Sequence, residues 1–226
     1  MTQPVGAGEA TPQLRILVFD ERASVGHGLR NLLQGDPAVL AVDWVREPEL
    51  VEKVIRAGRP DVVLVDASTA STSSSAVISA IGGMPDPPAV VVLVDSPLSS
   101  EALKSVEAGA VSVVTLTDSP EDLVDAVKTA RREVLRVPAS LLRSLLRDAS
   151  DRHLPAKGGL ASLTRREREV LSLLASGHDR HSIAARLYCS PETVRTHIRN
   201  VLTKLNAHST VEAVALAVQL GAEHDH

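Results

Sequence analysis

Short apolar runs alternate with amphipathic stretches along residues 14–135. The apolar runs are rich in Val, Ile and Leu, which is typical of strands that are buried on both faces of a parallel sheet. The stretches between them place apolar residues three and four positions apart, as amphipathic helices do. The predicted strands are 14–19, 39–45, 61–66, 89–94 and 111–116, and the predicted helices are 24–34, 47–58, 99–109 and 119–135.

This alternation predicts an α/β fold with a doubly wound, five-stranded parallel sheet of the flavodoxin-like kind. The third unit departs from the pattern, because residues 67–89 are rich in Ser and Thr. These residues favour turns and caps over helix interiors. We therefore expect a loop in this segment, with a short or frayed helix.

After residue 160 the pattern is helical only, and it predicts an all-α domain of four helices. Thr164 and Glu167 stand three positions apart and form a capping box at the start of the first helix. Ser190 followed by Pro191 is a typical start for the third helix, since proline fits the first helical position. The predicted helices are 163–177, 179–189, 193–205 and 211–221.

The segments outside these two regions define the domain boundaries. Residues 1–13 have little apolar content and predict a disordered leader. Residues 137–160 predict a flexible linker that is partly helical. We therefore expect one domain at 14–136 and a second at 161–222.

The composition narrows the compartment and the class of ligand. Phe19, Trp44 and Tyr188 are the only aromatic residues, so the chain offers no platform for stacking single-stranded bases. We expect Tyr188 to belong to the core beneath the turn before the third helix. Cys189 is the only cysteine, which excludes an internal disulfide and favours a reducing cytoplasm as the compartment. We expect Cys189 itself to be a small buried hydrophobic residue. Neither a signal-peptide pattern nor an apolar run of about 20 residues is present, so we expect a cytoplasmic protein with no membrane partner.

Charge is distributed unevenly between the two halves of the chain. Residues 1–137 carry 12 Lys and Arg against 19 Asp and Glu, a net charge of −7. Residues 138–226 carry 12 against 9, a net charge of +3. A basic module attached to an acidic one is typical of a DNA-binding domain joined to a regulatory domain.

The third C-terminal helix carries its basic residues opposite its apolar face. Two short helices joined by a tight turn, the second with outward arginines, match the geometry of a major-groove reader. Arginine can donate two hydrogen bonds to guanine, and threonine can contact a thymine methyl group. The sequence therefore favours double-stranded DNA as the partner of this domain.

The stretches LTRREREVL, IAARLYCSPETVRTHIRNVLTKL and STVEAVALA closely resemble the LuxR/NarL-type helix-turn-helix. The resemblance implies that the third helix enters the major groove and that the fourth can dimerise. A homodimer would then read two half-sites on the DNA. Its two copies would contact each other through either the 214–220 region or the 98–109 helix with the strand after it. Alternatively, the 214–220 residues pack only inside their own domain. The resemblance implies Arg195, Thr196 and Arg199 as base-facing residues, with Thr193, His197, Asn200 and Lys204 near the DNA backbone.

The N-terminal domain resembles the receiver domain of two-component response regulators. Asp20 and Glu21 follow the first strand and Asp66 ends the third, and strand ends meet at one crevice of an open sheet. In a receiver, these three acids could hold Mg²⁺ and Asp66 would accept a phosphoryl group. We expect no firm metal site here, because other parts of the receiver pattern are absent.

Three positions depart from the receiver pattern. Val94 replaces the Ser or Thr that ends the fourth strand, Leu116 replaces the Lys that ends the fifth, and Val113 replaces its aromatic residue. Losing the lysine removes a charge-assisted contact to phosphate, worth roughly 1.5–3 kcal/mol. We therefore favour an atypical receiver whose Asp66 is vestigial, within a DNA-binding transcription regulator that works without phosphorylation.

Such a receiver would act either as a constitutive dimerisation platform or as a sensor of an unknown small ligand. The alternative is a phosphorylation-activated response regulator that uses Asp66 and has a sensor kinase as partner. An enzyme is not expected, because the chain has no glycine-rich phosphate loop, nucleophile elbow or dinucleotide fingerprint.

Overall fold

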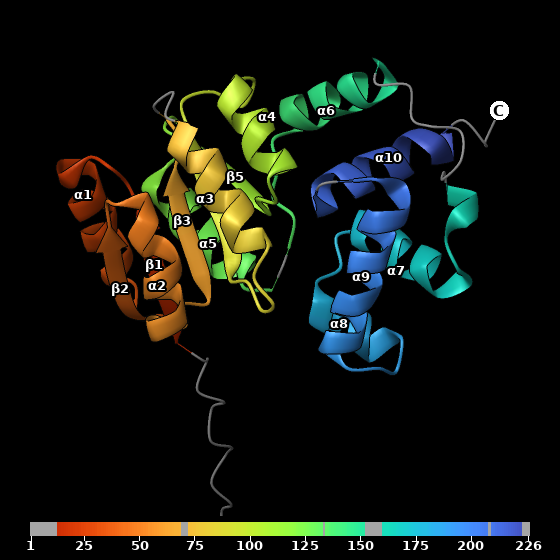
Figure 1. Ribbon diagram of the computed structural model, residues 1–226, viewed down its shortest axis with the longest axis horizontal. Helices are drawn as coiled ribbons and strands as arrows, with labels where there is room; N and C mark the ends of the chain where they lie inside the picture. The colour runs from red at the N-terminus through yellow and green to blue at the C-terminus, as the bar shows by residue number, and fades with distance from the viewer. Residues whose placement is uncertain (1–12, 69–71, 133, 152–159, 208, 223–226) are drawn as a thin grey trace, which may run out of the picture.

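The computed structural model describes residues 13–68, 72–132, 134–151, 160–207 and 209–222. They form an α/β domain followed by an all-helical domain, with one helix between them (Figure 1). The predicted leader 1–13 lies outside the described residues except for Gln13. The boundaries of the two domains stay predictions.

Five parallel strands form one sheet in the order β2-β1-β3-β4-β5, which confirms the predicted doubly wound fold. The order reverses between β1 and β3, so the crevice expected at such a switch point lies beyond the ends of these two strands. The strands are β1 (Leu14–Phe19), β2 (Val39–Val45), β3 (Val62–Asp66), β4 (Ala89–Val94) and β5 (Ser112–Thr115).

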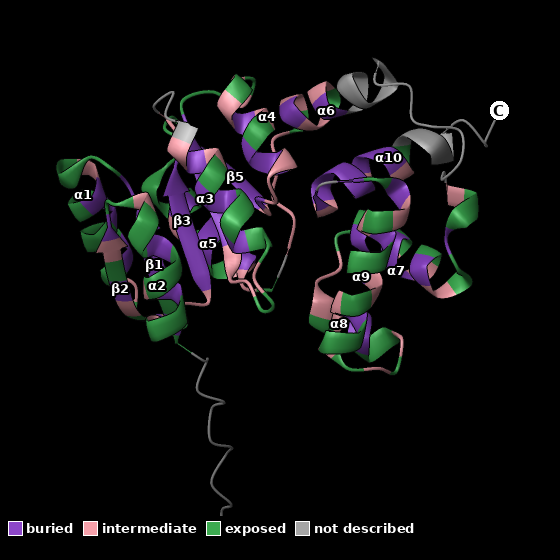
Figure 2. Cartoon of the chain, viewed as in Figure 1, coloured by how far each residue is buried: buried purple, intermediate pink, exposed green. Residues whose placement is uncertain are grey.

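Helices cover both faces of the sheet and bury it. Every residue of β3 is buried, as expected for a central strand, whereas the edge strand β2 mixes buried, intermediate and exposed residues (Figure 2). α2, α3 and α4 contribute to the core on one face, and α1 and α5 to the core on the other. Their bounds are α1 (Ala23–Gln34), α2 (Pro48–Gly58), α3 (Thr72–Gly82), α4 (Ser100–Glu107) and α5 (Pro120–Ala130).

The helix α3 corrects the expectation of a loop with a short or frayed helix in the third unit. It runs for 11 residues, and Val77, Ile78 and Ile81 are buried against the sheet. Ser74 Oγ donates a hydrogen bond of 3.0 Å to the carbonyl oxygen of Asp66, which ties the helix start to β3. Tertiary packing of one apolar face thus outweighs the weak helix propensity of the serines.

The connector begins with a helix, α6 (Ala139–Asp151), as expected for a linker that is partly helical, but this helix is packed and not flexible. Leu141 and Leu145 are buried in the same core as Ala102 of α4 and Val211 of α10. Apolar residues four positions apart give this helix an apolar face. This face is buried because it packs against helices of both domains. The rest of the predicted linker falls largely on 152–159, outside the described residues.

The C-terminal domain has the four predicted helices, preceded by one 3₁₀ turn. The capping box is confirmed, because the Glu167 carboxylate accepts from the Thr164 backbone N–H at 2.7 Å and the threonine hydroxyl accepts from the Glu167 N–H at 3.3 Å. Two small apolar cores hold the helices together. The elements are η1 (Leu160–Ser162), α7 (Arg165–Ala175), α8 (Arg180–Arg186), α9 (Pro191–Leu205) and α10 (Thr210–Ala222).

Tyr188 does not belong to the core, contrary to expectation. It lies in the turn between α8 and α9 with a positive φ of 52°, and 97% of the residue is exposed. The turn points its side chain away from the domain. Leu187 and Cys189, both half-buried, pack against the core on either side of it.

Candidate DNA-binding surface and acid pocket

Caps and turns position the helix α9, whose outer face is the candidate DNA-binding surface. Asp179 caps α8 by accepting from the Ser182 N–H at 2.7 Å. Ser190 caps α9 by accepting from the Thr193 N–H at 3.2 Å, and Pro191 fills the first helical position. Both caps satisfy backbone donors that a helix start leaves without partners, so the two helices can follow one tight turn.

One face of α9 is buried, and this fixes the direction of the other. Val194, Ile198, Val201 and Leu205 are at most 8% exposed and lie three or four positions apart. The opposite face therefore turns to the surface. There the structure places the predicted DNA-contacting residues Thr193, Thr196, Arg199 and Asn200 as exposed, and Arg195 and His197 as half-buried.

Arg195 contacts the α/β domain in this arrangement. Its guanidinium donates to the carboxylate of Asp86, in the loop between α3 and β4, whose side chain is 91% exposed. A cleft of about 430 Å³ separates the domains here, lined by Arg195 and Arg199 from α9 and by Met84 and Pro87 from the loop. Part of the predicted base-facing surface thus faces the α/β domain.

Lys204 is half-buried, with 35% of its side chain exposed, and it pairs with a carboxylate of its own domain. Its Nζ donates to both carboxylate oxygens of Glu167, at 2.7 and 3.0 Å, and Glu167 is only 3% exposed. This ion pair, together with the backbone N–H of Thr164, lowers the pKa of Glu167. A role for Lys204 at the DNA backbone stays a prediction that competes with this internal contact.

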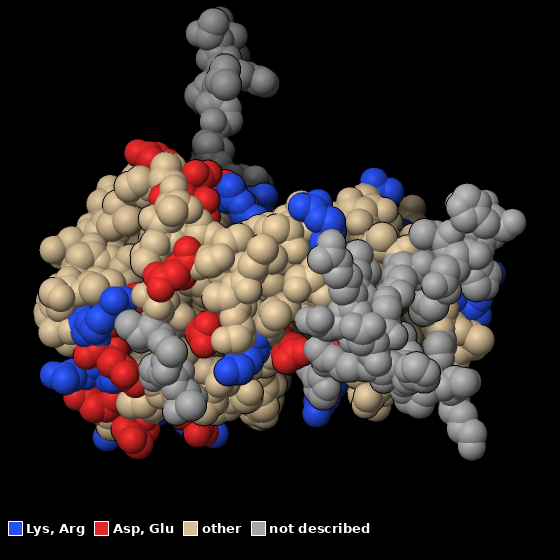
Figure 3. Space-filling model, turned by 90° about the horizontal axis from the view of Figure 1, so that it is seen from above, with Lys and Arg blue, Asp and Glu red and all other residues tan. Residues whose placement is uncertain are grey.

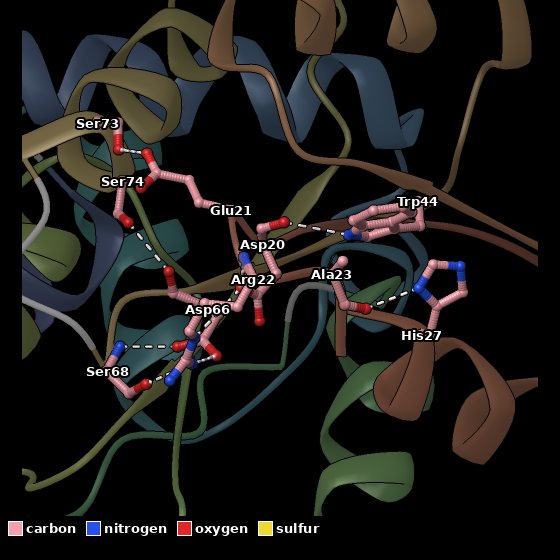
Figure 4. Close-up of polar contacts among 10 residues, drawn as sticks. All are labelled: Asp20, Glu21, Arg22, Ala23, His27, Trp44, Asp66, Ser68, Ser73 and Ser74. Carbon is pink, nitrogen blue, oxygen red and sulfur yellow. Dashed lines mark hydrogen bonds and ion pairs between the residues drawn. The ribbon is translucent and has the colours of Figure 1, made fainter. Parts of the chain in front are cut away.

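The acid pocket lies where β1 and β3 end, as the sequence predicts. Asp20 and Asp66 both have side chains that are only 2% exposed (Figure 4). Burial raises the pKa of Asp20 to about 6, the Arg22 backbone N–H opposes this rise, and the neighbouring Asp66 adds to it. Trp44 borders the pocket, because its Nε1 donates to the Asp20 carbonyl oxygen at 3.1 Å. Gly26 of α1 leaves the space that the indole occupies.

Arg22 occupies this pocket, and the sequence analysis did not identify it. Its guanidinium donates to Asp66 Oδ2 at 2.5 Å and to Ser68 Oγ at 2.9 Å, and its Nε lies 3.5 Å from Asp20 Oδ1 (Figure 4). The signal available in the sequence was a basic residue two positions after Asp20, just before α1 begins. Arg22 can reach Asp66 only because the fold places β1 beside β3.

Glu21 does not join the other two acids. It accepts a hydrogen bond from Ser73 of α3, on the far side of the pocket from Arg22 (Figure 4). Within the described residues, no group of three His, Cys, Asp or Glu side chains is arranged to hold a metal ion. The predicted set of Asp20, Glu21 and Asp66 therefore does not fit Mg²⁺ in this structure.

Two of the three departures from the receiver pattern, Val94 at the end of β4 and Leu116 just after β5, place hydrocarbon at this end of the sheet, whereas Val113 lies near the start of β5. Val94 and Val113 are buried, and Leu116 follows β5 with 52% of the residue exposed. A hydrocarbon side chain can neither donate to a phosphoryl oxygen nor pair with it.

Seen from above, most of the acidic side chains in view lie over the α/β domain, with Lys and Arg side chains among them (Figure 3). Among the helices that the structure describes, none is long and apolar enough to cross a membrane.

Comparisons with known proteins agree with this architecture. The model of the family "Bacterial regulatory proteins, luxR family" matches residues 161–217. The nitrate/nitrite response regulator protein homolog of Haemophilus influenzae is 29% identical over 205 residues, covering 90% of this chain and 96% of that protein. The nitrate/nitrite response regulator protein NarP of Escherichia coli is 28% identical over 211 residues, covering 93% and 97%.

A solved structure of the two-component response regulator RcsB in complex with DNA shows the same fold. It is 18% identical, with a TM-score of 0.51, over 92% of this chain and 98% of that one. The luxR family consists of regulatory proteins and not of enzymes, in agreement with the sequence analysis. Residues 161–217 are therefore a LuxR-family helix-turn-helix domain, and a receiver-like domain precedes it as in the NarL/NarP-type response regulators that this chain resembles.

Proposed function

We propose that this protein is a sequence-specific, DNA-binding transcription regulator that acts in the cytoplasm as a dimer and does not depend on phosphorylation of Asp66. The observation that carries the proposal is the outer face of α9, where arginine and threonine side chains lie at the surface of a LuxR-family domain. Such a helix, held by its apolar face, can be presented to the major groove.

The residues of this face divide by their reach. Arg195, Thr196 and Arg199 contact base edges, where arginine can donate two hydrogen bonds to guanine. The DNA backbone is contacted by Thr193, His197, Asn200 and Lys204.

The contact between Arg195 and Asp86 adds a condition to this function. Arg195 cannot donate to a base while its guanidinium faces the α3–β4 loop. α9 therefore has to move away from the α/β domain before it enters the groove. One exposed ion pair contributes only about 0–1 kcal/mol, so DNA can compete with it.

Phosphorylation independence is supported by the acid pocket. Asp66 is already paired with Arg22, and Val94 and Leu116 offer no polar group to a phosphoryl oxygen. The second candidate function is a response regulator activated by a sensor kinase at Asp66, favoured by the position of this buried carboxylate at the end of β3.

Dimerisation would use exposed apolar side chains. Leu98 is 60% exposed before α4, and Val218 is 47% exposed on α10, so both predicted interfaces offer one such residue. Leu216 is buried in its own domain, and the side chain of Leu220 lies outside the described residues.

A gel-shift series at fixed salt tests the DNA-binding proposal, with a duplex obtained by in vitro site selection. Arg195→Ala and Arg199→Ala should each cost roughly 1–3 kcal/mol, about 5- to 150-fold in affinity. Arg56→Ala, an exposed arginine on α2 of the other domain, is the control and should leave affinity unchanged. Unchanged affinity in both α9 variants contradicts the proposal.

The same assay separates the two candidate functions. Asp66→Asn and treatment with acetyl phosphate should leave DNA affinity unchanged if the protein works without phosphorylation. A stoichiometric phosphoprotein that binds DNA more tightly would instead establish the second candidate.

A further inference from the structure

We infer that Arg22 is a built-in cation of the acid pocket, and that its guanidinium takes the place in which a divalent metal would be held between Asp20 and Asp66. The inference rests on the proposed phosphorylation independence and deepens it by naming the side chain that closes the pocket. The contacts of Arg22 with Asp66, Ser68 and Asp20 carry it.

The local backbone directs Arg22 into the pocket. Asp20 Oδ1 accepts from the Arg22 backbone N–H at 2.7 Å, which closes a tight turn just after β1. Arg22 then adopts an extended conformation, with φ −91° and ψ 108°, as the residue before α1. The same carboxylate therefore holds the backbone of Arg22 and lies near its side chain.

The guanidinium lies over the two carboxylates as a cover. The Arg22 side chain is 41% exposed, whereas those of Asp20 and Asp66 are 2% exposed. It joins the end of β1 to the end of β3 and to the loop after it, through Asp66 and Ser68. Figure 4 shows these contacts on the side of the pocket away from Trp44.

A metal ion would have to displace this cover. A divalent cation needs several oxygen ligands, and here Asp66 Oδ2 already accepts from the guanidinium and Asp66 Oδ1 from the Ser68 backbone N–H. Adding two positive charges beside Arg22 would also set like charges against each other. Glu21, which could have been a third ligand, is engaged with Ser73.

Magnesium titration of the full-length protein tests the inference, with Trp44 fluorescence as readout. Trp44 is the only tryptophan, and its indole N–H donates to the backbone of Asp20, so its fluorescence reports on this pocket. MgCl₂ is added at constant ionic strength, without DNA or phosphodonor. The wild-type protein should show no saturable change.

Arg22→Gln, which removes the charge and keeps most of the length, should bind Mg²⁺ at least about tenfold more tightly than the wild type. Arg22→Lys keeps the charge and should exclude Mg²⁺ as the wild type does, and Arg56→Gln is the matched control outside the pocket.

Two results overturn the inference. One is saturable Mg²⁺ binding by the wild-type protein at low millimolar concentration, which is decisive even if Arg22→Gln does not fold. The other is a folded Arg22→Gln protein that binds Mg²⁺ no better than the wild type. Neither measurement involves DNA, so a failure here is distinct from a change in DNA binding by Asp66→Asn, which would contradict the proposed function itself.

Discussion

The acid pocket and the outer face of α9 both display arginine, but they hold it in different ways. In the pocket, Arg22 pairs with carboxylates that are almost fully buried. On α9, Arg195 pairs with Asp86, which is 91% exposed, and Arg199 is exposed. A buried carboxylate loses much if its cation leaves, whereas an exposed pair exchanges its partner at little cost. The burial of the carboxylate partner, more than the arginine itself, thus decides whether an arginine is held as a structural cation or is available to bind phosphate.

The largest expected difference between the two regions is in the pH dependence of stability, which the buried Asp20 of the pocket should dominate. The pKa of Asp20 in the folded protein is about 6, above its ordinary value of 3.8, so between these values the folded state holds a proton that the unfolded chain releases. Stability should therefore fall as pH rises through this window, by up to about 3 kcal/mol. Urea unfolding of Asp20→Asn at about pH 4 and pH 7 should show a smaller fall than the wild type. Asp43→Asn, an exposed acid on β2, should retain the wild-type difference.

Glu167 tests whether the second buried carboxylate behaves like the pocket. Glu167→Ala removes the partner of Lys204 and half of the capping box, and should lower the free energy of unfolding by about 2 kcal/mol. Glu169→Ala, which loses only partly exposed pairs with Arg165 and Arg166, should cost less than about 0.5 kcal/mol. Equal losses in denaturant titrations would mean that burial of the partner does not matter.

Tyr188 offers a smaller effect of opposite sign in the DNA-binding region. Its positive φ is strained for a residue with a Cβ, and its exposed ring packs on nothing that would offset the strain. Tyr188→Gly should therefore raise the free energy of unfolding, by about 1 kcal/mol or less once the greater freedom of unfolded glycine is counted. Asn206→Gly should change stability less, because asparagine tolerates its φ of 53° better than tyrosine does. A loss of stability in Tyr188→Gly contradicts this reasoning.

The smallest effect should come from the exposed pair itself. Asp86→Asn removes the negative charge that pairs with Arg195 and should tighten DNA binding by no more than about fivefold, because such pairs contribute about 0–1 kcal/mol. Asp95→Asn, another exposed acid of the same domain, should leave the affinity in gel shifts unchanged. A much larger gain would show that the Asp86 contact is not an ordinary surface pair.

Hydrophobic periodicity was enough to predict the sheet and the four C-terminal helices, because both are built from repeated local patterns. The helix-turn-helix followed from the outward arginines and from the resemblance to the LuxR/NarL type. The strand ends Asp20 and Asp66 followed from topology alone, since parallel strands bring their carboxyl ends together. Arg22 could not be predicted in this way. A single basic residue in a turn has no period, and its partner lies 44 positions away.

Two other differences arose where local preference and packing disagree. The serines before Val77 indicate a loop when considered alone. The helix nevertheless forms, because three apolar residues of α3 pack against the sheet. Tyr188 is of a residue type that is often buried, yet the left-handed turn directs it outward. In both places the backbone arrangement of neighbouring elements, which no single segment encodes, decides the outcome.

The contact between Arg195 and Asp86 makes the receiver-like domain a tethered competitor of DNA. Both partners belong to one chain, so they compete within each molecule. The apparent affinity for an operator is therefore the intrinsic affinity multiplied by the fraction of molecules in which α9 is free of this contact. Added salt weakens phosphate contacts, but it also weakens the pair that hides Arg195. The slope of log affinity against log salt should therefore be shallower than the number of phosphate contacts would give, and Asp86→Asn should restore the full slope.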